Sequence, residues 1–532
     1  MKKTVLFLLS IQSVFSASAQ SGGLDERINE AFTPFSNACL NVVLWQVPGT
    51  GVPLIIFLLV IGALFFTIYF KFPNVMKFGT ALNVVRGKYD ELEKHEGAHK
   101  SDVNIVDGDI VDTIRDESQD GEVSHFQALA TAVSGTVGLG NIAGVAIAIS
   151  IGGPGATFWM IICGLLGMST KFVECTLGVK YREIGPDGTV YGGPMYYLRK
   201  GLEEKGFGGL GKVLAVVFAV LCVGGSFGGG NAAQSNQAAA QLASLMGLQG
   251  GSSGFFIGLA LAFVVGIVII GGIKRIASVT EKIVPLMAVI YILACLVVVF
   301  ANFSYLGTAF GKIFSGAFSG DAAVGGFVGA LIQGFRRGAF SNEAGAGSAS
   351  IAHAAVKTKF AASEGLVALL EPFIDTVVIC TMTALVIIFY NSGNHFAYGD
   401  VTNDMVTIGG NQMGGAELTS AAFADVIPWF PYVLTIAIVL FAISTMISWS
   451  YYGLQSWKFL FGKSRAADLS YKFMFLAFVV IGAAAQMSAV WNFSDAMILG
   501  MVFPNMIGLF FLFPVVRDEL SKYMTAIRGS KV

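Results

Sequence analysis

A run of small and polar residues, Ser134-Gly-Thr-Val-Gly-Leu-Gly-Asn141, interrupts one of the apolar stretches of the sequence. Its three glycines are poor helix formers, each costing about 1 kcal/mol relative to alanine. Irregular backbone at membrane depth survives only where it is buried in protein or lines a polar cavity. A helix broken there offers N–H groups from one half and carbonyls from the other, which suit an anionic group and a cation. The run therefore predicts a ligand site to which Thr136 and Asn141 add side-chain oxygens; a Gly-rich helix-packing face is the alternative.

A second interruption, Arg337-Gly-Ala-Phe-Ser-Asn-Glu-Ala-Gly-Ala-Gly-Ser348, lies in a later apolar stretch. It holds Ser341, Asn342 and Glu343, and polar residues inside a membrane are functional candidates by default because burying them is costly. The two interrupted segments are predicted to cross in opposite directions. Such a pair of breaks predicts a transporter made of inverted repeats, with its site near the midplane.

Neutral amides follow a Gly-rich run in another apolar stretch, at Asn231, Gln234 and Gln237. Their spacing of three residues places them on or near one helical face. Amides both donate and accept hydrogen bonds, so they can bind a zwitterion without burying a net charge. Hydrogen bonding between helices is the alternative role, more so for Gln237 than for Gln234.

Hydroxyl groups gather late in the sequence at Ser444 and Thr445, one turn before Trp449. Hydroxyls that face loosened backbone carbonyls form a small oxygen site of the kind that binds Na⁺. The alternative is that both hydroxyls bond the carbonyls of their own helix. Trp449 is placed to shape or cap a substrate cavity.

The remaining intramembrane charges have structural explanations, and two carboxylates among them also have a functional one. Lys171 and Glu174 lie three residues apart and are expected to neutralise each other. Glu371 and Asp375 are carboxylates of the kind a proton-coupled mechanism would use, or they pair with Arg336 or Arg337.

Composition makes this a polytopic membrane protein: of 532 residues, 55% are hydrophobic and only 13% are charged. No Ser-His-Asp set, H-E-x-x-H motif or Walker sequence is present, which argues against an enzyme. The net charge of −1 indicates no partner by itself, and we expect no nucleic-acid partner. Eleven segments approach the roughly 20 residues that a bilayer requires. They are expected at 52–71, 125–151, 155–180, 212–247, 253–271, 278–301, 322–352, 363–390, 425–456, 469–487 and 492–516.

The distribution of Lys and Arg predicts the orientation in the membrane. The start of the sequence resembles a signal peptide, with Lys2 and Lys3 before an apolar run and Ala17-Ser-Ala19 as a cleavage site. With the mature N-terminus outside, the outward loops contain only Arg27 and Lys312, and every inward loop is basic. This predicts a bacterial inner-membrane protein with a periplasmic N-terminus and a cytoplasmic C-terminus.

The core divides evenly near residue 305, with one interrupted helix opening each half. A charged stretch precedes the core, with an amphipathic helix expected near Val75–Val85. The expected division is a signal peptide (1–19), a periplasmic segment (20–51), an accessory helix (52–71), a cytoplasmic polar segment (72–124), a first repeat (125–304), a second repeat (305–516) and a cytoplasmic tail (517–532).

Several motifs together resemble the alanine or glycine:cation symporter family. They are Thr136-Val-Gly-Leu-Gly-Asn-Ile-Ala-Gly144, Gly152-Gly-Pro-Gly155, Gly193-Pro-Met-Tyr-Tyr-Leu198, Phe340-Ser-Asn-Glu-Ala-Gly345 and Trp449-Ser-Tyr-Tyr-Gly453. The matches run in family order from about residue 50 to the end. The resemblance implies an all-α polytopic fold of the amino-acid–polyamine–organocation superfamily, with two inverted five-helix repeats plus one accessory N-terminal helix. It also implies Na⁺-driven uptake of alanine or glycine.

The resemblance also implies residue roles. Amides around Leu139 and Gly140, with Thr136, would hold the substrate carboxylate. Backbone carbonyls near Ala132, Gly135 and Phe340, helped by Gln234, would take the ammonium, and Trp449 would limit side-chain size. The implied substrate residues are Thr136, Gly138, Leu139, Gly140, Gln234, Phe340, Asn342 and Trp449.

For the coupling ion, the resemblance implies one Na⁺ site. It comprises the carbonyls of Ser134 and Val137 and the hydroxyls of Ser444 and Thr445, and Asn141 is a candidate for a second site. The expected partners are alanine or glycine and the lipid bilayer. Two alternatives stay open: a proton-coupled small amino-acid transporter, and a cation channel, against which the lack of a short repeated filter sequence argues.

Overall fold

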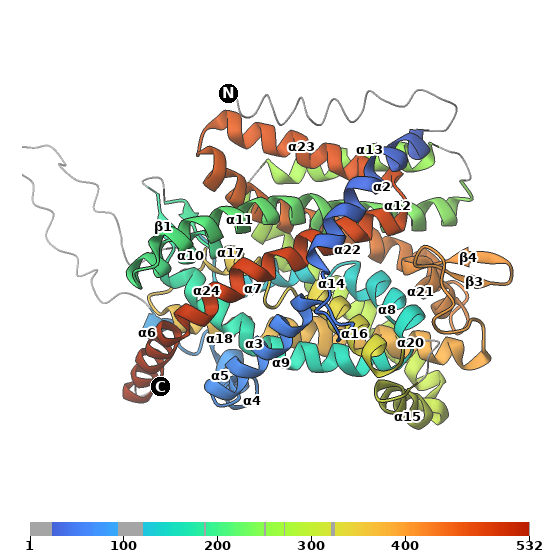
Figure 1. Cartoon of the computed structure of the whole chain (residues 1–532), viewed down its shortest axis with the longest axis horizontal. Coiled ribbons are helices and arrows are strands. Elements are labelled where there is room, and N and C mark those ends of the chain that lie inside the picture. Colours follow the sequence, from blue (N-terminus) through green and yellow to red (C-terminus); the bar gives the residue numbers. More distant parts are fainter. Residues whose placement is uncertain are drawn as a thin grey trace, which may run out of the picture.

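The computed structural model of the chain describes residues 24–93, 121–185, 188–248, 252–270, 272–320 and 325–530. The expected signal peptide at 1–19 and residues 94–120 of the expected cytoplasmic polar segment (72–124) lie outside these residues. The described chain is a bundle of helices with two short hairpins (Figure 1). The prediction of an all-α polytopic membrane protein is confirmed.

Long apolar helices form the bundle. Among the described residues, seven are long and apolar enough to cross a membrane, and a bent pair makes an eighth. Two shorter apolar helices, α3 (Leu54–Tyr69) and α13 (Ser253–Ile269), coincide with further expected segments. The longer elements are α9 (Gly155–Lys180), α11 (Gly208–Phe227) with η3 (Gly228–Ala232) and α12 (Ala233–Met246), α14 (Gly272–Ala301), α18 (Ala361–Ala368) with α19 (Leu370–Pro372), η6 (Phe373–Cys380), α20 (Thr381–Tyr390) and η7 (Asn391–Gly393), α22 (Phe430–Phe461), α23 (Arg465–Ala484) and α24 (Met487–Gly529).

The first predicted break is present. Helix α7 (His125–Thr136) ends inside the Gly-rich run, and the chain resumes as a π-helical turn, η2 (Gly140–Gly144), and α8 (Val145–Gly152). The two halves are bent by 49°. The bend follows from the glycines, which weaken the helix at the point where the first half ends.

The second predicted break is present as well. Helix α16 (Gly326–Asn342) ends at Glu343, whose φ of 56° is left-handed. Gly345 and Gly347 also have positive φ, at 92° and 84°, before the short helix α17 (Ser350–His353). A positive φ is unfavourable for residues other than glycine, so the second break depends on its glycines.

Several elements were not expected from the sequence. Helix α2 (Leu24–Val43) packs against α24 through a hydrogen bond from the Ser36 hydroxyl to the Ala489 carbonyl, 2.5 Å long. A helix α15 (Leu306–Ala317) links the two halves of the sequence. The helix expected near Val75–Val85, by contrast, is present as α5 (Phe78–Val85). The remaining short elements are α4 (Pro73–Met76), α6 (Asp90–Glu93), β1 (Glu183–Ile184), β2 (Val190–Tyr191), α10 (Pro194–Glu204), η4 (Phe303–Tyr305), β3 (Val406–Ile408), β4 (Asn411–Met413) and α21 (Gly415–Ala424).

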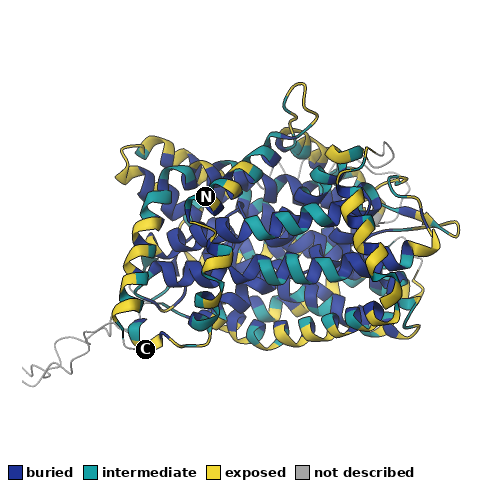
Figure 2. Cartoon of the chain, turned by 90° about the horizontal axis from the view of Figure 1, so that it is seen from below, coloured by how far each residue is buried: buried dark blue, intermediate teal, exposed yellow. Residues whose placement is uncertain are grey.

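The bundle has two distinct ends. Helices α6 and α10 and the C-terminus lie at one end of its long axis, and α15, α21 and the β3–β4 hairpin lie at the other (Figure 1). We call the first the basic end, because its loops carry the Lys and Arg residues that predict the cytoplasmic side. Buried residues fill the middle of the bundle and exposed ones lie around it (Figure 2). The two breaks are fully inside this buried region.

Candidate substrate and sodium site

The two breaks lie against each other. A Cβ atom added to Gly140 would be 3.5 Å from the Phe340 ring and 3.6 Å from the Ser341 backbone. This close approach brings irregular backbone from both halves of the sequence to one place. That juxtaposition is what the paired interruptions predicted.

Gln234 faces the first break. The N–H of Leu139 donates to the Gln234 carboxamide oxygen at 3.0 Å, and Gln234 donates to the Gly229 carbonyl at 2.8 Å. A carboxamide oxygen therefore lies where an anionic oxygen would accept from the same N–H. The Leu139 N–H of the break is therefore a donor that an acceptor oxygen can reach.

Gly138 lies at a close approach between the first break and two neighbouring helices. A Cβ there would be 2.4 Å from the Thr445 hydroxyl oxygen and 3.0 Å from the Gln234 carboxamide oxygen. No side chain fits in that space. The absence of a side chain at Gly138 is what lets α7, α12 and α22 converge.

The predicted sodium ligands meet across the same interface. The Thr445 hydroxyl donates to the Ser134 carbonyl at 2.9 Å, and the Ser134 hydroxyl donates to the Ser444 carbonyl at 2.8 Å. The Ser444 hydroxyl donates to the Phe441 carbonyl in its own helix at 2.9 Å. Val137 follows α7 with a ψ of 87°, outside the helical range. Hydroxyls and backbone carbonyls of α7 and α22 are thus gathered in one buried place. Among the described residues no group of three His, Cys, Asp or Glu is placed to hold a metal ion.

Trp449 and Phe340 pack on the glycines of η3. A Cβ on Gly230 would be 2.2 Å from the Trp449 ring, and one on Gly229 would be 3.1 Å from the Phe340 ring. The Trp449 indole N–H donates to the Glu343 carboxylate at 2.9 Å. The second break therefore fixes the orientation of the indole.

Asn141 and Asn342 each hydrogen-bond to other residues and not to each other. Asn141 accepts from the Gly138 N–H at 2.9 Å and donates to the Asp375 carboxylate at 2.6 Å. Asn342 donates to Thr376 and accepts from the Ala344 N–H, both at 2.9 Å.

Thr136 lies at the end of α7 and directs its hydroxyl to carbonyls of its own helix. The structure thus gathers Ser134, Gly138, Leu139, Gly140, Gln234, Phe340, Ser444 and Thr445, with Trp449 beside them, whereas Asn342 faces the neighbouring helices.

Asp375 ties the two breaks together. Its carboxylate accepts from Asn141 of the first break and from the Ser341 hydroxyl of the second, the latter at 2.8 Å. The neighbouring Thr376 hydroxyl donates to it at 2.6 Å. The expectation that Asp375 or Glu371 pairs with Arg336 or Arg337 is therefore wrong.

The two arginines have a different partner, which the sequence reasoning missed. Arg336 lies 2.7 Å and Arg337 3.2 Å from the Asp495 carboxylate of α24. Arg337 also stacks over the Trp491 ring at 5.0 Å. Asp495 is a lone acid in an otherwise apolar stretch, and that isolation is the signal that could have identified it.

The expected Lys171–Glu174 pair is also wrong. Lys171 bonds to Glu371 at 3.0 Å, and Glu174 accepts from the Gly345 N–H at 2.9 Å and from Asn505 at 2.7 Å. The spacing rule describes exposed helix faces, whereas both residues are buried between helices.

The three amides do not share one ligand. Asn231 donates to the Phe475 carbonyl at 2.6 Å, and Gln237 accepts from the Ala416 N–H at 3.0 Å. Both hold helices together, and only Gln234 reaches the first break.

A buried polar site between two broken helices of a membrane-spanning bundle is the architecture of a secondary transporter. A family model described as the sodium:alanine symporter family matches residues 36–531. The chain is 43% identical to the sodium/alanine symporter AgcS of Methanococcus maripaludis, over 77% of this chain and 86% of that protein.

It is 35% identical to the probable sodium/glutamine symporter GlnT of Bacillus subtilis, over 92% and 91% of the two chains. The solved structure of MhsT in complex with L-phenylalanine matches 74% of this chain and 99% of that one, at 14% identity and a TM-score of 0.49.

The chain belongs to the sodium:alanine symporter family. It is therefore a Na⁺-coupled transporter and not an enzyme, and the resemblance that the motifs indicated is confirmed.

Proposed function

We propose that this protein moves alanine, and also glycine, into the cell together with Na⁺ by alternating access at the first break. The observation that carries this proposal is the position of Gly138 between the Thr445 hydroxyl and the Gln234 carboxamide. The backbone at Gly138 thereby faces a hydroxyl, which can bind Na⁺, on α22 and a carboxamide, which can bind a zwitterion, on α12.

The substrate carboxylate takes the N–H groups near Leu139 and Gly140, with the Thr136 hydroxyl beside them. In the structure the Gln234 oxygen accepts from the Leu139 N–H, so binding requires this carboxamide to turn away. Gln234 then helps the carbonyls near Phe340 hold the ammonium. A zwitterion is neutral overall, which suits a site whose nearest groups are amides and backbone.

The Na⁺ ion takes the carbonyls of Ser134 and Val137 and the hydroxyls of Ser444 and Thr445. Ser134 and Thr445 already meet at 2.9 Å, and an ion between them replaces that direct hydrogen bond. Asn141 is the candidate for a second ion, next to the Asp375 carboxylate.

Small substrate size follows from Trp449 and Phe340, which pack without space on Gly230 and Gly229. The match to a probable sodium/glutamine symporter covers more of the chain than the match to the alanine symporter, so glutamine belongs in any substrate test. The two aromatic rings favour alanine and glycine over it.

The basic end faces the cytoplasm of a bacterial cell in this proposal, because Lys and Arg gather there. A membrane potential that is negative inside favours inward Na⁺ by about 2.3 kcal/mol per charge per 100 mV. One coupled ion therefore supplies a substantial driving force for accumulation.

Uptake of [¹⁴C]alanine by proteoliposomes tests the proposal. An inward Na⁺ gradient is compared with an equal choline gradient, and unlabelled glycine and glutamine serve as competitors. We expect Na⁺-dependent accumulation that glycine suppresses and glutamine leaves largely intact.

Thr445→Ala is expected to weaken the Na⁺ dependence. Ser450→Ala is the matched control, because this hydroxyl of the same helix bonds only to the Ile447 carbonyl nearby among the hydrogen bonds seen in the described residues. Accumulation driven equally well by a pH gradient in choline would overturn Na⁺ coupling at this site.

A further inference from the structure

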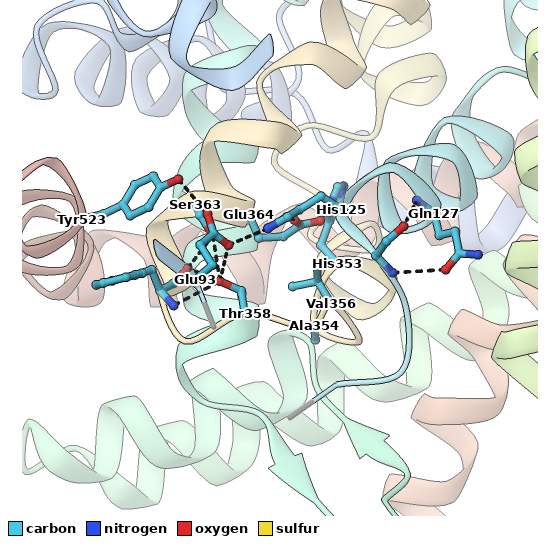
Figure 3. Close-up of polar contacts among 12 residues, drawn as sticks. Glu93, His125, Gln127, His353, Ala354, Val356, Thr358, Ser363, Glu364 and Tyr523 are labelled. Carbon is cyan, nitrogen blue, oxygen red and sulfur yellow. Dashed lines mark hydrogen bonds and ion pairs between the residues drawn. The ribbon is translucent and has the colours of Figure 1, made fainter. Parts of the chain in front are cut away.

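A second polar assembly is buried at the basic end of the bundle. Figure 3 shows the part of it around Glu93, His125 and Glu364. The whole assembly contains three acids and three bases, each from a different helix, and has no part in the proposed binding of substrate or Na⁺. Four of the six residues have 0% exposure, and Glu93 and His125 have 7% and 8%. We call this assembly the His–Glu cluster; its members are Glu93, His125, Glu364, His353, Glu371 and Lys171.

The links of the cluster follow one after another. His125 Nε2 lies 2.7 Å from a Glu93 oxygen, and His125 Nδ1 contacts Glu364. The other oxygen of Glu364 is 2.5 Å from His353 Nδ1. His353 Nε2 is 3.5 Å from Glu371, which is 3.0 Å from Lys171 Nζ.

The cluster joins elements that are distant in sequence. Glu93 belongs to α6, before the core, and also accepts from the Tyr523 hydroxyl of α24 at 2.7 Å. The Thr358 and Ser363 hydroxyls donate to Glu93 at 2.7 and 3.1 Å (Figure 3). Glu93 therefore ties the segment before the core, the chain that follows the second break and the C-terminal helix together.

The geometry favours the imidazolium form of both histidines, through two hydrogen bonds for His125 and through one hydrogen bond and one 3.5 Å ion-pair contact for His353. A neutral imidazole has one N–H donor and one lone pair, whereas an imidazolium has two donors. Each ring of the cluster presents both nitrogens to carboxylates: Glu93 and Glu364 for His125, and Glu364 and Glu371 for His353. Loss of a proton from either ring would direct a lone pair at a carboxylate.

The charge balance leads to the same conclusion. The three carboxylates are compensated by Lys171 and two imidazolium ions, and a buried charge without compensation is strongly unfavourable. With neutral histidines the cluster would hold two uncompensated negative charges. Other titratable groups also surround the cluster. Glu174, Cys175 and Glu343 lie near Lys171, and Tyr523 and Asp90 lie near Glu93. Arg182 bonds to the Thr358 carbonyl, and Glu281 accepts from Gln127, two residues after His125.

We propose that the His–Glu cluster is a proton-binding site that holds the basic end of the transporter closed, so that opening at this end releases protons. The proton is then an allosteric ligand of the carrier, acting on the side that the proposed orientation makes cytoplasmic. A histidine in water titrates near pH 6.5. Above that pH the closed end retains up to two protons that the open end gives up.

The sign of the effect follows from linkage. The state that binds more protons is favoured as the pH falls. The closed end is therefore fully stabilised below about pH 6.5 and loses that stabilisation as the pH rises. Opening that releases one proton changes the open-to-closed ratio about tenfold per pH unit. Release of two protons squares that factor.

The cluster is connected to the site that it controls. His353 ends α17, the helix that follows the second break, and Glu371 precedes by one turn the Asp375 that bonds to both breaks. His125 is the first residue of the first broken helix. Movement of either broken helix at this end must separate the cluster's carboxylates from its histidines.

Hydrogen–deuterium exchange of the full chain in lipid nanodiscs tests the proposal. The reporter is the backbone of residues 354–363, which carries Thr358 and Ser363, and rates are corrected for the intrinsic pH dependence of exchange. Between about pH 6.5 and about pH 8.5 we expect protection to fall by at least about tenfold in the wild type.

The double substitution His125→Gln with Glu93→Gln retains a hydrogen-bonding pair without its charges and its proton. It is expected to reduce the number of protons released on opening by about one, so that protection changes about tenfold less per pH unit than in the wild type. His395→Gln is the matched control, since this exposed ring stacks on Tyr390 at the other end of the bundle. His353→Gln tests the second proton independently.

Protection in the wild type that does not change with pH would overturn the proposal. An equal change in the wild type and in the double variant would overturn it as well. Exchange is measured without transport. A negative exchange result therefore overturns the proton-binding proposal alone, and a negative uptake result overturns Na⁺-coupled transport alone.

Discussion

Two buried charge clusters stand on either side of the second break, and they are made of different bases. Arg336 and Arg337 precede the break and share Asp495, whereas His353 follows it and belongs to the His–Glu cluster. Helix α24 contributes to both, through Asp495 near its start and Tyr523 near its end. At about 1.5 Å per residue these lie roughly 40 Å apart along that helix, about the width of a membrane.

The difference in base determines the difference in behaviour. Guanidinium stays charged at any pH that a cell meets, so the Arg–Asp cluster has a fixed charge. Imidazole changes charge near neutral pH, so the His–Glu cluster depends on its protons. The comparison indicates that one end of the transporter is held by permanent ion pairs and the other by pairs that pH can remove.

The largest expected effect comes from breaking the permanent cluster. Asp495→Asn leaves the Arg337 guanidinium, which is 1% exposed, without its carboxylate. Breaking a buried pair by removing one partner costs about 3–5 kcal/mol, so we expect a large loss of thermal stability in detergent. Asp468→Asn is the control, because its partners Lys458 and Lys472 are nearer the surface. Equal unfolding temperatures for both variants would show that the Arg–Asp cluster carries no stability.

A substitution in the first break, between the two clusters, is expected to have a smaller effect on stability but to weaken substrate binding. Gly138→Ala places a Cβ 2.4 Å from the Thr445 oxygen. Overpacking of this kind costs about 1–3 kcal/mol of stability, and the same free energy, where it falls on the substrate-bound state, weakens alanine binding by about 5- to 150-fold. Gly311→Ala in α15 has open space and is expected to be neutral. Unchanged alanine affinity in Gly138→Ala would remove this glycine from the site.

A smaller effect is expected at the contact between Trp449 and Glu343. Trp449→Phe keeps an aromatic ring on Gly230 but removes the indole N–H that donates to Glu343 at 2.9 Å. Leaving a buried carboxylate oxygen without that donor costs about 1–3 kcal/mol. We expect a modest loss of stability and weaker discrimination against larger amino acids in competition uptake. Discrimination equal to that of the wild type would show that the indole does not limit substrate size.

The sequence was sufficient to predict the broken helices and the side chains around the first break. Glycines inside an apolar stretch have few explanations in a membrane, and Ser134, Gln234 and Thr445 do meet there. The same reasoning failed for Lys171 and Glu174, whose spacing suggested a local pair. In a buried helix each charge finds its partner on another helix, and local spacing carries no information about that.

Long-range pairings were the part that could not be predicted. Nothing near Arg336 in the sequence indicates Asp495, and nothing near Glu93 indicates His125 or Tyr523. Helix α2 was missed because it is not apolar enough to suggest a membrane segment. The division into two inverted repeats stays a prediction from the order of the breaks.

Binding of alanine to the purified protein, measured by calorimetry in Na⁺ and in choline, tests most directly that Na⁺ and substrate share the first break. We expect Na⁺ to raise alanine affinity by at least about tenfold, and alanine to raise Na⁺ affinity by the same factor, because coupling between two ligands is reciprocal. Thr445→Ala should abolish that coupling while Ser450→Ala retains it. Alanine affinity that is the same in Na⁺ and choline would contradict the account.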